Sequence, residues 1–259
     1  MGGERRQKFV REVGSVVLGV LIALGLGAIA TEIGWRVEVR GARAAMSGEL
    51  GELIGQGEER VKIEACIERR LDDVARVVRD AERIGRLAPL GDIGLPPYRT
   101  WPRGVWQSTL DAQTAAHLDS ELLDNYATAY DFADQMATLH RGELDIWTRL
   151  HTLSGPGRAF SAEEARTLEL AISQARFANR MMALAGIRMK QVTSAYELGY
   201  DRAEADLYAK QPIAAFIICQ PIATEIPTGY GQAPMRGVSQ RALDNPITRA
   251  SLGLGVKRQ

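Results

Sequence analysis

The sequence is poor in aromatic residues and has no excess of charge of either sign. Aromatic side chains make up 6% of the 259 residues, while alanine and glycine are abundant, and this composition favours helices over a β-sandwich. The formal net charge is zero, so the chain has no general attraction for nucleic acid. We therefore expect an all-α protein without a nucleic-acid partner.

The common catalytic motifs are absent as well. The sequence contains no H-E-x-x-H pair, no G-x-S-x-G elbow and no phosphate-binding P-loop. His140 and Glu143 could share one helix face, but a metal site needs more ligands than two. The other acidic residues lie among arginines, as in exposed helical ion pairs. We expect no enzyme, no cofactor and no metal site, although a buried cluster of His140 with two carboxylates would favour an enzyme.

Charge is also missing from one long run near the N-terminus. No ionisable side chain lies between Glu12 and Glu32, a gap of 19 residues. As a helix this run would span about 28 Å, close to the thickness of the bilayer hydrocarbon. Gly25-x-Gly27-x-x-Ala30 matches a dinucleotide-binding pattern, but residues 36–60 contain no second strand, so that interpretation fails.

Two membrane interpretations remain for this run. Residues 13–31 fit an uncleaved transmembrane helix that follows a flank of residues 1–12. Ala28-Ile29-Ala30 resembles a signal-peptidase site, so a cleaved secretion signal is the alternative. We favour the anchor because the apolar run exceeds a usual signal core and no proline interrupts it. Both interpretations export the rest of the chain.

The basic residues on the two flanks suggest an orientation. Arg5, Arg6, Lys8 and Arg11 precede the run, and Arg36, Arg40 and Arg43 follow it. The small excess on the first flank predicts a cytoplasmic N-terminus. We expect a single-pass protein of a bacterial inner membrane, with its bulk in the periplasm.

Small residues recur along the predicted span. The spacing is four residues at first and seven later, which places a ridge of small side chains on one helix face. Such a ridge would let the span contact a second copy or another membrane protein, besides the lipid bilayer. Chance or a flexible stalk are the alternatives. The candidate packing residues are Ser15, Gly19, Ala23, Gly27, Gly34 and Gly41.

Residues 32–210 read as a helical stalk and an antiparallel bundle. Apolar residues at helical spacing predict helices over residues 57–85, 118–153 and 162–209, with a short helix over 104–116. Ser161 and Glu164 form a capping box at the start of the third. The proline-rich stretch between the first helix and the short one predicts a loop.

Residues 211–259 read as an extended tail rich in proline and glycine. Residues 213–219, IAAFIIC, are too apolar to remain in water, so we expect them to dock on the helices before the tail becomes disordered. Cys219 ends this apolar patch and Cys66 lies on the first bundle helix. In an exported protein we expect these two cysteines to form a disulfide, and two buried thiols are the alternative.

Trp101 and Trp106 flank the proline loop. They either plug the end of the bundle or line a binding groove.

The span VVLGVLIALGLG, the charged helix after it and the segment from W-x-x-x-x-W-Q-S-T-L to HLDSELLDNYATAY resemble a family of uncharacterised bacterial single-span membrane proteins. The likeness covers roughly residues 8–150, and the glycine series departs from the family pattern. The resemblance implies a membrane anchor and transfers no activity. We expect an interaction or scaffold protein, with a ligand-sensing bundle as the alternative.

Overall fold

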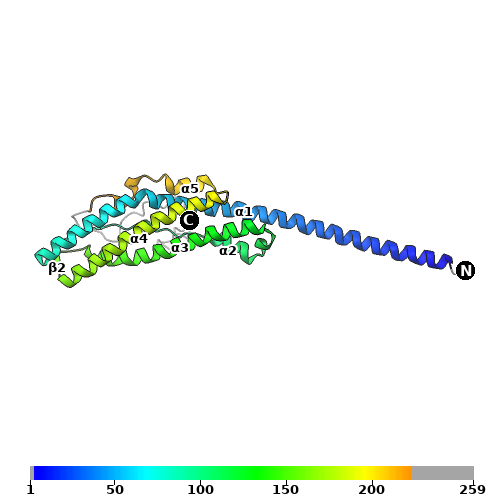
Figure 1. Cartoon of the computed structure of the whole chain (residues 1–259), viewed down its shortest axis with the longest axis horizontal. Helices are drawn as coiled ribbons and strands as arrows, with labels where there is room; N and C mark the ends of the chain where they lie inside the picture. Colours follow the sequence, from blue (N-terminus) through cyan, green and yellow to red (C-terminus); the bar gives the residue numbers. More distant parts are fainter. Residues whose placement is uncertain (1–2, 223–259) are drawn as a thin grey trace, which may run out of the picture.

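The computed structural model describes residues 3–222, and its first helix forms a rod that projects far beyond the rest of the molecule (Figure 1). Helix α1 runs without a break over Gly3–Ile84, 82 residues that extend about 120 Å. The first proline of the chain is Pro89, so nothing interrupts this helix. Gly85, at φ +74°, ends it in the left-handed conformation that favours glycine.

The apolar part of α1 is exposed over its whole length. Between Gly14 and Ile84 it contains a stretch of mean hydropathy 2.3, none of which is buried in the protein. Met46 is the first fully buried side chain along the helix from Gly14 onward. The described part of the chain thus has one helix long and apolar enough to cross a membrane, consistent with a single-pass anchor.

The rest of the described chain forms an all-α bundle with the second half of α1. A long connection returns along α1 to the short helix α2, Gly104–Asp111, and the 3₁₀ turn η1, Thr114–His117. Helix α3, Ser120–Leu150, then runs in the same direction as α1, and α4, Ala162–Ala195, runs antiparallel to both (Figure 1). At the far end, β1, Arg86–Leu87, pairs with β2, Arg158–Ala159.

Side-chain caps define where three of the helices begin. Asp119 accepts hydrogen bonds from Glu121 N–H and Leu122 N–H at the start of α3. Ser161 accepts from Glu164 N–H at the start of α4, which confirms the predicted N-cap. Asp201 caps α5, Arg202–Ala209, in the same way. Each cap satisfies backbone donors that a first helical turn leaves unpaired.

Two of the predicted helices are interrupted. The prediction of one helix over 162–209 is wrong, because Glu197 adopts φ 52° and Asp201 N–H donates to the Ser47 carbonyl of α1. That contact starts α5 as a separate helix. The predicted helix over 104–116 is likewise divided into α2 and η1 at Gln113, which has φ 60°.

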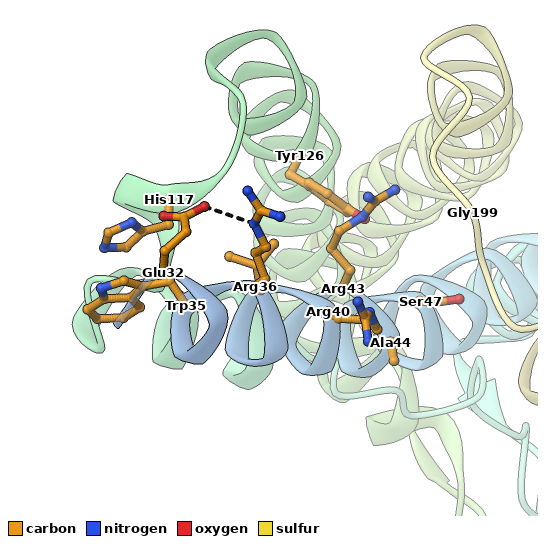
Figure 2. Close-up of a pocket in the computed structure, with 11 residues that line it drawn as sticks. Glu32, Trp35, Arg36, Arg40, Arg43, Ala44, Ser47, His117, Tyr126 and Gly199 are labelled. Carbon is orange, nitrogen blue, oxygen red and sulfur yellow. Dashed lines mark hydrogen bonds and ion pairs between the residues drawn. The ribbon is translucent and has the colours of Figure 1, made fainter. Parts of the chain in front are cut away.

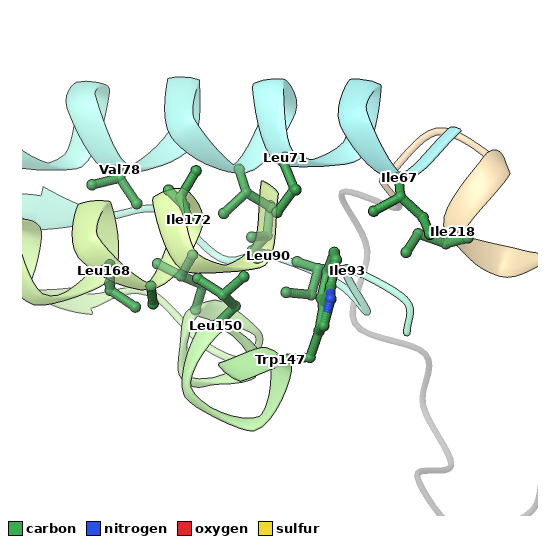
Figure 3. Packing of buried hydrophobic residues seen from close by; sticks show 14 of the residues in the cluster. Ile67, Leu71, Val78, Leu90, Ile93, Trp147, Leu150, Leu168, Ile172 and Ile218 are labelled. Atoms are coloured by element: carbon green, nitrogen blue, oxygen red, sulfur yellow. The ribbon is translucent and has the colours of Figure 1, made fainter. Parts of the chain in front are cut away.

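The bundle contains two apolar clusters along its length. The distal cluster joins α1, α3 and α4 to the connection after α1 and to the docked tail, as Figure 3 shows for Leu71, Trp147, Ile172, Leu90 and Ile218. The cluster nearer the rod contains Met46, Leu50, Tyr130 and Met182. Polar side chains from α1, α3 and α4 separate the two clusters.

The described part of the tail docks as predicted. It forms the 3₁₀ turns η3, Ile213–Ala215, and η4, Ile217–Cys219, and it buries Phe216 and Ile218. The predicted disorder toward the C-terminus concerns residues 223–259, which lie outside the described residues.

Candidate functional site

The predicted packing residues lie together on the exposed first half of α1. At Gly19, Gly27, Gly34 and Gly41, an added Cβ would meet no described atom within 4 Å apart from the backbone of its own helix. Ser15 and Ala23 are exposed on the same stretch. Seven residues are almost two helical turns, so Gly34, Gly41 and Gly48 stay on one face, with a drift of about 20° per step. We call this the glycine face of α1.

Helix α5 covers the continuation of the glycine face inside the bundle. Gly51 packs against the backbone of Asp201, and Gly55 packs against the backbone of Ala205. A side chain at either glycine would overlap a backbone carbonyl oxygen, so only glycine permits this approach. The glycine face therefore packs closely against a helix from Gly51 toward the C-terminus of α1. It is open from Gly48 toward the N-terminus.

A pocket of about 550 Å³ lies on the opposite side of α1, where the rod enters the bundle (Figure 2). Its walls come from α1, from η1 and α3, and from the loop between α4 and α5. Arg36 and Arg43 point from α1 toward α3 (Figure 2), and Arg40 also lines the space. Glu32 accepts a hydrogen bond from Arg36 Nε at 2.9 Å.

Two aromatic contacts position this pocket. Trp35 of α1 stacks on His117 of η1, with ring centroids 3.9 Å apart and an angle of 17° between planes. Tyr126 of α3 lines the pocket and stacks on Trp106, with centroids 6.3 Å apart. The first contact holds η1 against the rod, and the second connects the pocket wall to the core.

Trp101 and Trp106 are themselves buried. Trp106 stacks on Tyr130 at 5.2 Å, and Trp101 packs edge-on against His140 at 6.4 Å. The pocket of Figure 2 is lined by Trp35 and Tyr126 and not by either of these tryptophans. Trp106 nonetheless contacts Tyr126, which lines this pocket.

A buried ionic layer separates the two apolar clusters. Arg60 Nη2 of α1 donates to Glu143 Oε1 of α3 at 2.7 Å and to Asn179 Oδ1 of α4 at 3.4 Å. These three side chains are fully buried. One polar group from each long helix thus meets at the same level of the bundle.

A second ion pair adjoins this layer. Arg99 donates to both carboxylate oxygens of Glu59, at 2.9 and 2.6 Å. Its backbone N–H donates to His140 Nε2 at 3.3 Å, and His140 Nδ1 lies 3.7 Å from Glu143 Oε2. The carboxylates of Glu59 and Glu143 are buried and each is paired with an arginine, an arrangement that fits a structural layer.

Sequence reasoning missed the buried carboxylates. It assigned the acidic residues to solvated pairs, yet Glu49, Glu59 and Glu143 are buried. Glu49 accepts from Val105 N–H at 2.9 Å and from Trp106 N–H at 3.1 Å, and so caps α2 from another helix. Within residues 14–222, whose side chains the structure describes, no group of three or more His, Cys, Asp or Glu side chains could hold a metal ion.

Cys66 and Cys219 form a disulfide, with their Cα atoms 4.8 Å apart and a separation of 153 positions in sequence. Arg70 lies one turn further along α1 and donates to the carbonyls of Ile217 and Gln220. Burial lowers the pKa of the Arg70 guanidinium, and Asp73 and Asp92 partly oppose this. The bond and the buried arginine together hold the tail on the bundle.

A scan of protein-family models, a search of curated proteins and a search of solved structures each found no match to this chain. The resemblance to the single-span family therefore stays a prediction.

Proposed function

We propose that this chain is an interaction or scaffold protein of a bacterial inner membrane, crossing it once with the N-terminus in the cytoplasm and the bundle in the periplasm. The observation that carries the proposal is the glycine face of α1. Helix α5 covers this face at Gly51 and Gly55, and the face continues uncovered toward the apolar run. A second helix can approach there as closely as α5 does, because no side chain separates the backbones.

The disulfide supports the periplasmic side. Disulfides persist in oxidising compartments such as the periplasm and are rare in the cytosol. The bonded Cys66 and Cys219 lie in the bundle, whereas the rod carries no cysteine. The partner on the glycine face is a second copy of this chain or another membrane protein.

Oxidative crosslinking in native membranes tests the proposal. Gly34→Cys adds one thiol on the glycine face, and the native cysteines are already bonded. Arg36→Cys is the matched control, because it lies at nearly the same depth but about 200° around the helix. We expect a disulfide-linked dimer, or a link to another membrane protein, for Gly34→Cys only. Equal yields for both variants, or recovery of monomer alone, would count against the proposal.

A ligand-sensing bundle that acts through a partner is the second candidate. The pocket beside Tyr126 favours it, because this residue stacks on buried Trp106 and so connects the pocket to the core. A ligand that shifts Trp106 fluorescence in a Tyr126-dependent manner would support sensing. An enzymatic function has weaker support, since His140 and its neighbouring carboxylates are buried and already paired.

A further inference from the structure

The pocket at the base of the bundle carries an excess of positive charge. Arg36, Arg40 and Arg43 line it together with one carboxylate, Glu32, which pairs with Arg36. Across the part of the chain that the structure describes, no ion pair engages Arg40 or Arg43. Two guanidinium groups therefore face the pocket without a carboxylate to neutralise them.

The pocket begins where the apolar run of α1 ends. Thr31 is the last residue of that run, Glu32 is the first lining residue, and Arg36 lies five residues beyond Thr31, about 8 Å along the helix. The headgroup layer on each side of a bilayer is roughly 5–8 Å thick. Arg40 and Arg43 lie about 14 Å and about 18 Å beyond Thr31 along the helix, so the pocket extends from the headgroup layer into the adjoining water.

The neighbouring groups suit a phosphate at a membrane surface. Guanidinium groups bind phosphate oxygens through paired hydrogen bonds. Trp35, stacked on His117, forms the wall nearest the apolar run, and tryptophan is enriched at the level of lipid headgroups. Tyr126 and Ser47 add hydroxyl groups to the opposite part of the lining, which suit a polar headgroup.

We propose that this pocket binds the phosphate-bearing headgroup of an anionic phospholipid in the leaflet from which α1 emerges. The inference rests on the membrane location given under the proposed function, and it is independent of self-association. The bound headgroup would fix the height and rotation of the bundle over the membrane. It would not compete with a second helix, because the pocket arginines and Gly34 lie on opposite sides of α1.

Native mass spectrometry of the full chain in detergent tests this assignment. The protein is titrated with phosphatidylglycerol, with zwitterionic phosphatidylcholine and, separately, with inorganic phosphate. Arg40→Gln/Arg43→Gln removes the two unpaired charges. Arg79→Gln/Arg166→Gln is the matched control, because it removes the same charge from exposed positions on the distal half of the bundle. Circular dichroism confirms that both variants fold.

We expect phosphatidylglycerol to bind the double pocket variant about 25-fold more weakly than the wild type, at about fivefold per arginine. The control should bind like the wild type, and phosphatidylcholine should bind more weakly than phosphatidylglycerol. An equal loss of phosphatidylglycerol affinity in the pocket variant and the control variant, or no loss in either, would overturn the site. Displacement of the lipid by inorganic phosphate at equal concentration would overturn its assignment to a lipid.

The same variants separate this inference from the proposed function. Lipid binding in detergent requires neither insertion nor dimer formation, so it can fail while Gly34→Cys still crosslinks in membranes. That outcome would remove the headgroup site alone. Crosslinking can also fail while the arginine-dependent lipid binding persists, which would remove the scaffold proposal and leave the site in place.

Discussion

Gly57 and Gly186 bring the backbones of α1 and α4 into direct contact: a Cβ on Gly57 would lie 2.9 Å from the Cα of Gly186. Gly48, about two and a half turns earlier on α1, has no atom within 4 Å of its Cβ position other than the backbone of its own helix. The same residue type on one helix therefore has two different roles.

Alanine substitutions distinguish these roles. Gly57→Ala overpacks the α1–α4 contact, so we expect a loss of about 1–3 kcal/mol in the free energy of unfolding. Gly48→Ala meets open space and gains helix propensity, so we expect a gain of up to about 1 kcal/mol. Urea unfolding followed by circular dichroism measures both. A stabilised Gly57→Ala protein would contradict the close contact.

The buried Arg60–Glu143 pair gives a second prediction. Glu143→Gln leaves Arg60 without its counter-ion in the core, and we expect a loss of about 3–5 kcal/mol in unfolding free energy. Arg60→Met combined with Glu143→Leu should cost less than the sum of the two single changes.

An exposed ion pair on the same helix provides the control for the Arg60 and Glu143 substitutions. Arg83 and Asp80 are both about 70% exposed, so Arg83→Gln should change the unfolding free energy by less than about 1 kcal/mol. Additive effects of the Arg60 and Glu143 changes would show that these two side chains do not interact.

The disulfide prediction concerns the tail. Cys66→Ser/Cys219→Ser opens a 153-residue link, so we expect a loss of about 2–5 kcal/mol in unfolding free energy. Trypsin should then cleave faster after exposed Lys210, because the following segment keeps its hydrogen bonds from Lys62 and Arg70 and its apolar contacts but loses the covalent link. Limited proteolysis with and without reductant measures this.

The double serine variant is also the control, since reductant should not change it further. A non-reduced digest of the wild type must contain the Cys66–Cys219 peptide pair. Its absence would contradict the bond.

The alkaline stability of the bundle depends on Tyr130. Burial, and then the nearby carboxylate of Glu49, raise the pKa of the Tyr130 phenol well above its usual value near 10. Above pH 10 the unfolded chain releases the Tyr130 proton while the folded chain retains it. The contribution of Tyr130 to the free energy of unfolding is therefore fully present below pH 10 and is lost as pH rises further. The slope reaches about 1.4 kcal/mol per pH unit.

Tyr130→Phe should remove that slope from urea unfolding measured between pH 9 and pH 11. Tyr98→Phe is the control, because Tyr98 is 68% exposed and its phenol is open to solvent. An unchanged slope in Tyr130→Phe would show that another group causes the alkaline loss.

The apolar seams of the long helices could be predicted from sequence, whereas the ionic layer could not. In α4, buried Asn179 lies between the buried apolar residues Ala175 and Met182. In α3, buried His140 and Glu143 lie between the buried apolar residues Met136 and Trp147. Polar residues at seam positions were the available signal, and a pattern based on apolar residues leaves them out.

The break after α4 depends on a tertiary contact. Residues 196–201 contain no proline, so helical spacing alone continues through them. The Asp201 N–H instead bonds to Ser47 of α1, and α5 then packs on the glycine face. Sequence periodicity describes one helix at a time and does not include such competition between helices.

The pocket at the candidate site also depends on contacts between helices that sequence periodicity does not include. Trp35 and Arg36 were recognisable as residues flanking the span. Their meeting with His117 and Tyr126 results from the return of the chain to the base of the bundle after the proline-rich connection. That return is set by the packing of α2 and α3 against α1, which no local pattern specifies.

The account depends most on α1 remaining whole as a membrane anchor. The intact mass of the protein, expressed in a bacterial host and recovered from carbonate-washed membranes, tests this directly. We predict the full chain at 28.3 kDa in the membrane fraction. A soluble periplasmic species that begins at Thr31 would contradict the anchor and, with it, the glycine-face and headgroup proposals.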